Sequence, residues 1–178
     1  MRILYRVSQF WRSIFVKTDP LELERALALL SPEQSGLFSQ MQPGEKDHAL
    51  IMVRKLIAQG ENQPDLLVAA MLHDIGKLRY RLHPLERTMV VLAKAIMPGK
   101  AHQWGNLPHG GWHNVPVWRK AFVVAEQHAQ WGAQLAHQAG VSPLAETLIR
   151  EHHNPHPLPT SSTETSLLYK LWVVDNES

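Results

Sequence analysis

The stretch Leu66–Tyr80, LLVAAMLHDIGKLRY, decides the fold of this chain. Its first seven residues are apolar on every side, which is typical of a helix at the centre of a domain. His73 and Asp74 follow directly, and an isolated carboxylate buried at that point would cost several kcal/mol. A neutralising cation would remove most of that cost. We expect Gly76 to let the chain turn sharply after this pair, and Lys77 to leave the helix as a free cation.

The composition narrows the class of protein and the class of metal site. The 178 residues suit one domain, and the net charge of +2 is too small to indicate a nucleic-acid partner. The chain has no cysteine, which excludes disulfides and thiolate metal sites, but it has eleven histidines. Any metal must therefore be held by nitrogen and oxygen atoms.

Helix-start signals recur along the whole chain, and no stretch alternates polar and apolar residues over the length of a strand. Each signal is a capping residue followed by proline or by an acid or amide in the first turn. We predict a single-domain, all-α bundle of about seven helices. The signals are Asp19-Pro20-Leu21-Glu22, Ser31-Pro32-Glu33-Gln34, Ser142-Pro143 and Ser161-Ser162-Thr163-Glu164.

The segment Met97–Trp118 interrupts this helical pattern with prolines, glycines, tryptophans and histidines. We predict a long Trp-rich loop, inserted between the helix that leads to His73-Asp74 and the helix that contains His128. Long loops within compact domains are often functional. The alternative is a surface loop that is merely anchored by its tryptophans.

The N-terminal stretch 1–17, MRILYRVSQFWRSIFVK, predicts a basic amphipathic helix rather than a signal peptide. Such a helix could lie on an anionic membrane, but packing on the domain is favoured. No apolar run reaches the roughly 18 residues that a membrane span needs, and we expect a cytoplasmic protein. We divide the chain into N-terminal helices at 1–44 and a main domain at 45–178.

Several histidines occupy helix positions where core residues are expected. His128 shares a stripe with Val124 and Trp131, and His152 continues the stripe of Leu148. Any one of them could be a hydrogen-bonded core histidine, but several on different helices favour a buried metal site. The candidate ligands are His48, His73, Asp74, His128, His152, His153 and Asp175. The other histidines, at 83, 102, 109, 113, 137 and 156, are predicted to lie in loops or on polar faces.

The motif HDIGK at 73–77, with His48 before it and Asp175 far after it, resembles the HD superfamily of metal-dependent phosphohydrolases. His128 and the pair His152-His153 extend the likeness to the H…HD…H…HH…D pattern of its two-metal members. The segment NPHPLPT after that pair lacks Gly-Tyr-Pro, so the HD-GYP subgroup is a poor match. The resemblance spans roughly residues 45–178.

This resemblance implies an all-helical fold and two metal ions that share Asp74. One ion would bind His48, His73, Asp74 and Asp175, and the other Asp74, His128, His152 and His153. Iron or manganese is the expected metal, and nickel, cobalt or zinc would also suit nitrogen and oxygen ligands. Two ions that share a carboxylate can hold a bridging water and make it a hydroxide nucleophile.

Three functions are compatible with these residues. The first is hydrolysis of a phosphoester in a nucleotide or another phosphorylated small molecule. Asp74 and Lys77 are its candidate catalytic residues, and Lys77 and Arg81 its candidate substrate-binding residues, with Arg79 as a weaker addition to a basic rim. Lys77 could instead be a solvated lysine at a helix end. The second function is a di-iron oxygenase similar to the inositol-oxygenase branch, and the third is a non-catalytic metal-binding sensor.

Overall fold

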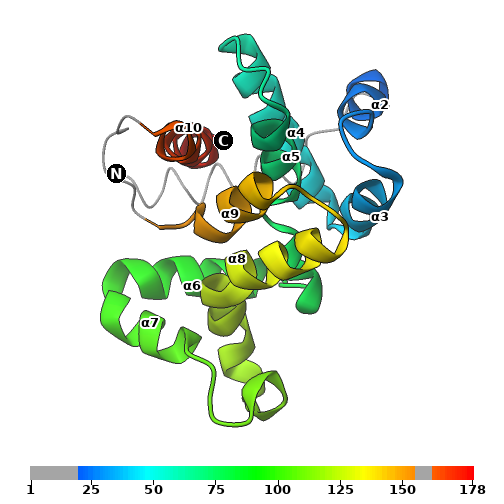
Figure 1. Ribbon diagram of the computed structural model, residues 1–178. Coiled ribbons are helices and arrows are strands. Elements are labelled where there is room, and N and C mark those ends of the chain that lie inside the picture. The colour runs from blue at the N-terminus through cyan, green and yellow to red at the C-terminus, as the bar shows by residue number, and fades with distance from the viewer. Residues whose placement is uncertain (1–19, 155–161) are drawn as a thin grey trace.

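The computed structural model describes residues 20–154 and 162–178, and these residues form no strand (Figure 1). The predicted all-α fold is confirmed. The predicted amphipathic helix at 1–17 and the prediction for His156 lie outside the described residues. The elements are α2 (Pro20–Leu27), α3 (Pro32–Gln40), α4 (Pro43–Ala58), α5 (Pro64–Leu72), η1 (Ile75–Arg79), α6 (Pro84–Ile96), α7 (Pro98–Gly105), η2 (Gly111–Asn114), η3 (Val117–Arg119), α8 (Lys120–Gln138), α9 (Pro143–Glu151) and α10 (Thr163–Glu177), where η marks a 3-10 helix.

Three of the four predicted helix-start signals act as the sequence predicts, and the fourth begins at Asp19, outside the described residues. The Ser31 side chain accepts a hydrogen bond from the Gln34 amide, and the Gln34 side chain accepts one from the Ser31 amide, which is a complete capping box. The Ser142 hydroxyl caps α9 by accepting from the Ala145 amide, and Ser162 caps α10. Most of the other helices also begin with proline, whose fixed φ suits a first turn.

Helix α5 lies at the centre of the main body, as its apolar sequence predicts. Leu66, Ala69, Ala70, Met71 and Leu72 are all completely buried. Helices α4, α9 and α10 pack around it, and α2 and α3 contribute Ala26, Leu30, Phe38 and Met41 to the same core. The N-terminal helices of the described chain therefore pack on the main body, while the boundary at residue 44 stays a prediction. None of the helices in the described ranges could span a membrane.

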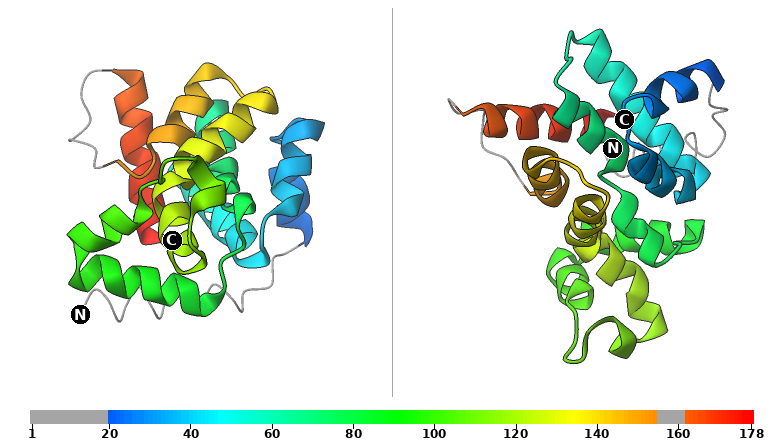
Figure 2. Two further views of the ribbon diagram at one scale, coloured as in Figure 1. Left: turned by 90° about the horizontal axis from the view of Figure 1, so that it is seen from below. Right: turned by 45° about the vertical axis from the view of Figure 1, so that its right-hand side comes forward.

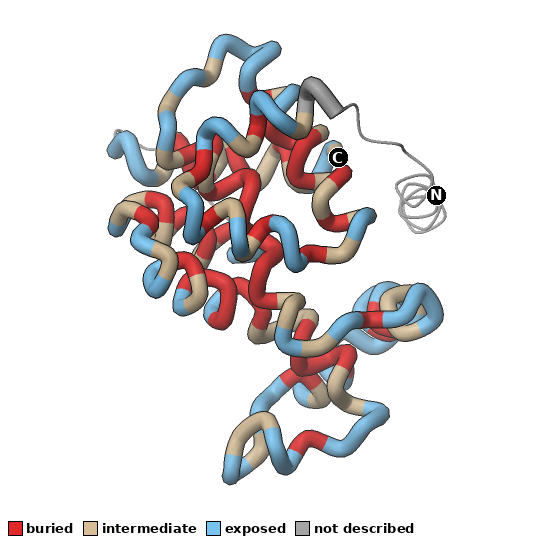
Figure 3. The backbone as a smooth tube through the Cα atoms, turned by 90° about the vertical axis from the view of Figure 1, so that its right-hand side faces the viewer, coloured by how far each residue is buried: buried red, intermediate tan, exposed pale blue. Residues whose placement is uncertain are grey.

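A second, smaller hydrophobic cluster lies beside this core and belongs to a lobe formed by residues 80–125 (Figure 3). Figure 2 shows the lobe, in green, on the other side of the molecule from α2 and α3, in blue. Helix α8 joins the two parts, since Phe122 and Val123 belong to the lobe cluster while Ala133 and Ala136 belong to the main core. The lobe cluster contains Leu82, Val90, Ala93, Ala101, Val115, Ala121, Phe122, Val123, Val124 and Trp131.

The predicted insertion at Met97–Trp118 is present, but it is only partly a loop. The segment holds α7 and the two short helices η2 and η3, and the described chain has nine α-helices where the sequence predicted about seven. The tryptophans do anchor the segment, as the alternative interpretation proposed: the ring centroid of Trp104 lies 5.0 Å from that of Phe122 and 5.7 Å from that of Trp118. Helix α7 begins without a side-chain cap and buries only Ala101 and Gly105, too little for a visible apolar stripe.

Gly76 is required for close packing rather than for the sharp turn that the sequence suggested. Its φ angle is not in the left-handed region, unlike that of Gly60, Gly110, Gly111 or Gly140. A Cβ atom on Gly76 would lie 1.9 Å from the His128 carbonyl oxygen and 2.7 Å from the Gly132 amide nitrogen. The backbones of η1 and α8 therefore touch at this point. This contact holds the segment after Asp74 against the helix that carries His128.

Candidate metal centre

The seven predicted ligands come together from five separate segments of the chain. His73 caps the C-terminus of α5 and is followed by Asp74, and His152 caps the C-terminus of α9 and is followed by His153. His128 lies within α8, His48 within α4 and Asp175 within α10. Two groups have ligand atoms that all lie within 4.8 Å of one another: His48, His73 and Asp74, and His128, His152 and His153.

Hydrogen bonds to the backbone fix the orientation of the three buried imidazoles. The Nδ1 atom lies 2.9 Å from the Ala70 carbonyl oxygen in His73, 2.9 Å from that of Val124 in His128 and 2.6 Å from that of Ile149 in His152. A carbonyl can only accept, so each Nδ1 carries a proton, and in the neutral imidazole the lone pair is then on Nε2. Metal-ligating histidines commonly donate their second nitrogen in this way.

The carboxylate of Asp74 lies between the two groups of imidazoles and is buried. Its Oδ1 atom is 3.3 Å from His128 Nε2, and its Oδ2 atom is 3.5 Å from His73 Nε2. One oxygen thus faces each group. Lys77 Nζ, 2.5 Å from Oδ2, donates a charge-assisted hydrogen bond to the same carboxylate.

Asp175 brings α10 to the first group. Its Oδ1 atom accepts a hydrogen bond from His48 Nε2 at 2.9 Å and lies 3.7 Å from His73 Nε2. Both side chains are about one-fifth exposed, so this side of the cluster is open to solvent while His73, Asp74, His128 and His152 are buried. Asp175 is less deeply buried than its sequence position suggested, but it does face the other ligands.

Acceptor atoms outnumber donors at the centre of the cluster. His152 Nε2 is buried and has no hydrogen-bond partner among the described residues, and His73 Nε2 faces two carboxylate oxygens. His153 Nε2 lies 2.8 Å from His128 Nε2, which requires a proton on one of the two nitrogens when no cation is present. Unpaired buried acceptors are costly, and a cation that accepts nitrogen and oxygen ligands would satisfy them. The residues therefore fit a metal site.

The two carboxylates stay ionised at neutral pH. Burial alone would raise the pKa of Asp74, but the nearby Lys77 ammonium, with His73 and His128, holds the pKa well below its usual value. Burial also acts to raise the pKa of Asp175, but the hydrogen bond from His48, together with the electrostatic effect of His73 and His48, outweighs burial and lowers the pKa. Both carboxylates are thus in the form that binds metal.

Three of the imidazoles, those of His73, His152 and His153, are held in the neutral form. Burial lowers the pKa of His73, and burial together with the neighbouring His153 lowers that of His152 well below its usual value. The His153 residue is exposed at the surface, yet desolvation of its ring and then the proximity of His128 lower its pKa to about 3. Neutral imidazoles beside ionised carboxylates are the protonation states that a metal requires.

We expect the metal-free protein to lose stability as the pH falls below about 6.5, the pKa of histidine in the unfolded chain. His73, His152 and His153 have lowered pKa values in the folded state, so acid protonates them preferentially in the unfolded state. Their contribution is complete above that pH and is lost progressively toward about 3, the folded pKa of His153. Thermal melts of chelated protein from about pH 7.5 to 4 test this. A constant melting temperature would show that the imidazoles already bind protons in the fold.

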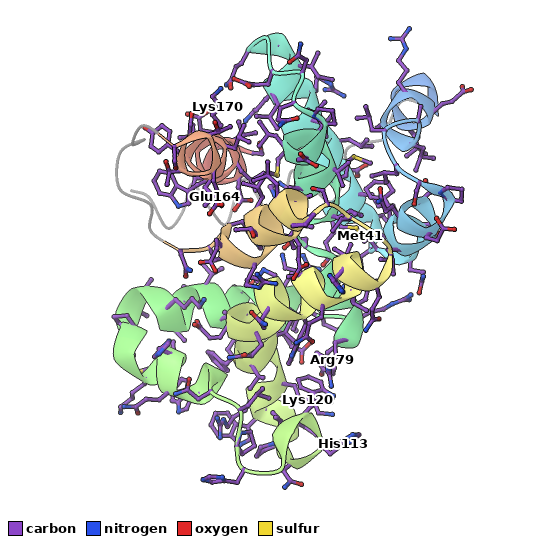
Figure 4. The ribbon with its side chains drawn as sticks, in the orientation of Figure 1. Met41, Arg79, His113, Lys120, Glu164 and Lys170 are labelled. Atoms are coloured by element: carbon purple, nitrogen blue, oxygen red, sulfur yellow. The ribbon has the colours of Figure 1, made fainter. Side chains whose placement is uncertain are left out.

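The predicted substrate-binding residues differ in their placement. Lys77 is paired with Asp74, so the prediction of a free cation is wrong, although its side chain is one-fifth exposed. Arg81 is exposed, and in ranges 20–154 and 162–178 it makes no hydrogen bond or ion pair, including with the ligand cluster. Arg79 stacks on Trp131, with its guanidinium carbon 4.7 Å from the ring centroid, and Figure 4 shows it near Lys120 at the edge of the lobe. Arg79 thus has a packing role.

The remaining histidines stay away from the cluster, as the sequence predicted. His83, His102, His109, His113 and His137 are all exposed. His102 and His137 form ion pairs with Glu126 and Glu146, respectively, when protonated.

Two positioning features escaped the sequence analysis. Gly132 faces Gly76 across the contact between η1 and α8, and its partner is 56 positions away, so no local pattern identifies it. Glu45 is buried one turn before His48 and binds Arg87 of α6 at 2.5 Å, which ties the lobe to the helix that carries this ligand. A buried acid in the first turn of a helix reads in sequence as an ordinary capping residue.

The comparisons with known proteins agree with this geometry. The HD domain family model matches residues 46–172, which is most of the chain and includes every candidate ligand except Asp175. No curated protein and no solved structure gives a significant match. The matched segment contains the helices that converge on the buried histidines. The chain is thus a member of the HD superfamily of metal-dependent phosphohydrolases.

Proposed function

We propose that this protein hydrolyses a phosphoester of a nucleotide or a similar phosphorylated small molecule. HD domains bind divalent metals, and their family consists in general of hydrolases. The placement of Asp74 carries the proposal: this ionised, buried carboxylate directs one oxygen toward each of the two imidazole groups. A carboxylate in that position can serve two ions at once, which is the arrangement used for in-line displacement at phosphorus.

The proposed ligand sets follow the two groups. His48, His73, Asp74 and Asp175 would hold one ion, and Asp74, His128, His152 and His153 the other. Iron and manganese suit these nitrogen and oxygen ligands, and nickel, cobalt and zinc are further candidates. When bound, two such ions activate a water molecule as the nucleophile and offset the charge that develops on the phosphoryl oxygens.

The chain's own cations would bind and orient the substrate. The Lys77 ammonium lies against the Asp74 carboxylate and is partly exposed, so it can donate to a phosphate oxygen that approaches the centre while it keeps its proton. Arg81, two residues after η1 and without an ion-pair partner in the described chain, would bind a more distant phosphate as a nucleotide enters.

We expect about two transition-metal ions per chain when the metal is supplied, and a melting temperature that falls on chelation and recovers with manganese or iron. Metal bound only to the folded state stabilises it by mass action. His152→Ala should remove much of this metal-dependent shift, because its Nε2 has no other partner. His102→Ala, on the exposed face of α7, is the control and should keep the full shift. Elemental analysis measures the metal content, and thermal melts measure the shift in melting temperature. A melting temperature that stayed the same on chelation and on addition of metal would contradict the metal site.

The function is tested by a screen of phosphoesters with iron- and manganese-loaded protein. The screen should include nucleotides, cyclic nucleotides and a chromogenic diester, with phosphate or alcohol release as the readout. Oxygen consumption without hydrolysis would favour an oxygenase. A protein that binds metal tightly but turns over none of these substrates would favour a sensor.

A further inference from the structure

Helix α6 directs an apolar stripe toward solvent instead of burying it. Leu85, Met89, Leu92 and Ile96 recur at the spacing of one helix face, and they are exposed by 81%, 41%, 41% and 72%. The opposite face, with Val90 and Ala93, fills the lobe cluster. Folded proteins rarely expose contiguous apolar surface of this kind unless it binds something.

The stripe continues onto the neighbouring elements of the lobe. Met89, Leu92, Ile96, Met97, Trp104 and Trp118 line one groove whose walls come from α6, α7 and η3. Trp118 and Val117, at the end of this surface, are 56% and 71% exposed. In Figure 1, α6 and α7 form an outer edge of the molecule that no other described helix covers. We call this apolar surface of α6, α7 and η3 the lobe face.

The lobe is also the basic part of the described chain. Residues 80–125 contain six Lys and Arg residues and one acid, Glu86, which gives 6 − 1 = +5. The whole chain carries +2, so all the other residues together carry 2 − 5 = −3. Two of the six cations are neutralised by acids, Arg87 by Glu45 and Lys94 by Glu126. Lys100 is exposed on α7, and Arg119 donates to the backbone carbonyls of Gln103, Trp104 and Asn106, which leaves its charge uncompensated.

We propose that the lobe face docks on an anionic lipid bilayer. Exposed tryptophan and aliphatic side chains beside uncompensated Lys and Arg charges match the interfacial layer of such a membrane, where apolar burial and attraction to acidic headgroups add together. A second copy of the chain is a poorer occupant, because a two-fold contact would bring together two lobes that each carry a net charge of +5. A nucleic acid would use the cations but not the aliphatic stripe.

The N-terminal stretch is also a poor cover for this surface. Residues 1–18 contain Arg2, Arg6, Arg12 and Lys17 and no acid, so they would be repelled by the lobe. The same charges would be attracted to the membrane that we propose. This docking does not depend on the proposed hydrolase activity, because none of the groove residues is a candidate ligand.

Co-sedimentation of the full chain with vesicles tests the proposal. The protein should bind equimolar phosphatidylcholine–phosphatidylglycerol vesicles and not phosphatidylcholine alone, and added salt should weaken binding. The double variant L85Q/I96Q should bind at least about tenfold more weakly, since both side chains lose their apolar contact with lipid. K100Q should weaken binding about fivefold. The double variant L29Q/I57Q changes two exposed apolar residues elsewhere and should bind as the wild type does.

Several results would overturn the proposal. The first is vesicle binding that L85Q/I96Q leaves unchanged. If F10Q/W11Q then abolished vesicle binding, the N-terminal stretch would be the binding element instead of the lobe face. Equal binding to neutral and anionic vesicles would remove the role of charge. A dimer that L85Q/I96Q converts to monomer, without vesicle binding by the wild type, would make a second copy the occupant. If the protein bound a DNA duplex but no vesicles, the occupant of the lobe face would be a nucleic acid. L85Q/I96Q, K100Q and L29Q/I57Q should melt at the wild-type temperature, since they alter exposed side chains.

Discussion

Asp74→Asn is expected to lower phosphoester hydrolysis by at least ~10², the low end for loss of metal-based electrostatic stabilisation. The amide keeps the size of the side chain but removes the negative charge that faces both His73 and His128. It also leaves the Lys77 ammonium without its carboxylate partner. The affinity of the protein for both proposed ions should therefore fall. Measurements of kcat/KM and of metal content by elemental analysis would show the two losses.

Asp65→Asn provides the matched control for this variant. Asp65 lies at the N-terminal end of α5, the helix that His73 and Asp74 follow, and its Oδ1 atom accepts a hydrogen bond from the Ser142 hydroxyl. An amide oxygen can accept the same bond, so metal content and activity should stay at the wild-type level. If Asp74→Asn were equally active, the chemistry would have to occur elsewhere in the molecule.

Gly76→Ala is expected to have the largest effect on stability. The added methyl carbon would lie 1.9 Å from the His128 carbonyl oxygen and 2.7 Å from the Gly132 amide nitrogen, and neither backbone atom can rotate away. Overpacking usually costs about 1–3 kcal/mol, and a clash between two backbones belongs at or above the upper end. Because His128 itself is part of the contact, separation of η1 from α8 should also lower metal affinity. Thermal melts with and without metal would measure both effects.

Gly36→Ala is the control for the packing effect. Gly36 lies in α3, a Cβ atom there would meet no atom within 4 Å, and its φ is not in the left-handed region. Alanine should therefore leave the melting temperature unchanged or raise it slightly, since it has the higher helix propensity. If Gly76→Ala also melted at the wild-type temperature, the close approach of the two backbones would not be a constraint on the fold.

The sequence was sufficient to select candidate ligands that lie together in the structure, because several of them stand out from their surroundings. His128 and His152 interrupt apolar stripes, and His73-Asp74 follows a helix with no polar face, so the conflict between residue type and position is visible locally. The caps at Ser31 and Ser142 are equally local. The order of the ligands along the chain then indicated the superfamily.

The features that the sequence did not reveal depend on contacts between distant residues. The partner of Gly76 is a backbone carbonyl on α8, and the acceptors that fix the imidazoles are main-chain atoms with no sequence signature. Helix α7 has no cap and a short buried face, so its glycines suggested a loop. The apolar stripe of α6 was visible, but periodicity cannot tell a face that packs on the domain from one that remains exposed.

The contact between Gly76 and His128 closes the chain between these two residues into a loop. The polypeptide leaves the metal centre at η1, builds the lobe, and returns to within a backbone contact of its point of departure. The entropy of closing such a loop grows only slowly with its length, so residues can be added to or removed from the far side of the lobe at small cost in stability. Within this fold, the outer part of the lobe can therefore change in length and surface character while the ligand geometry stays fixed.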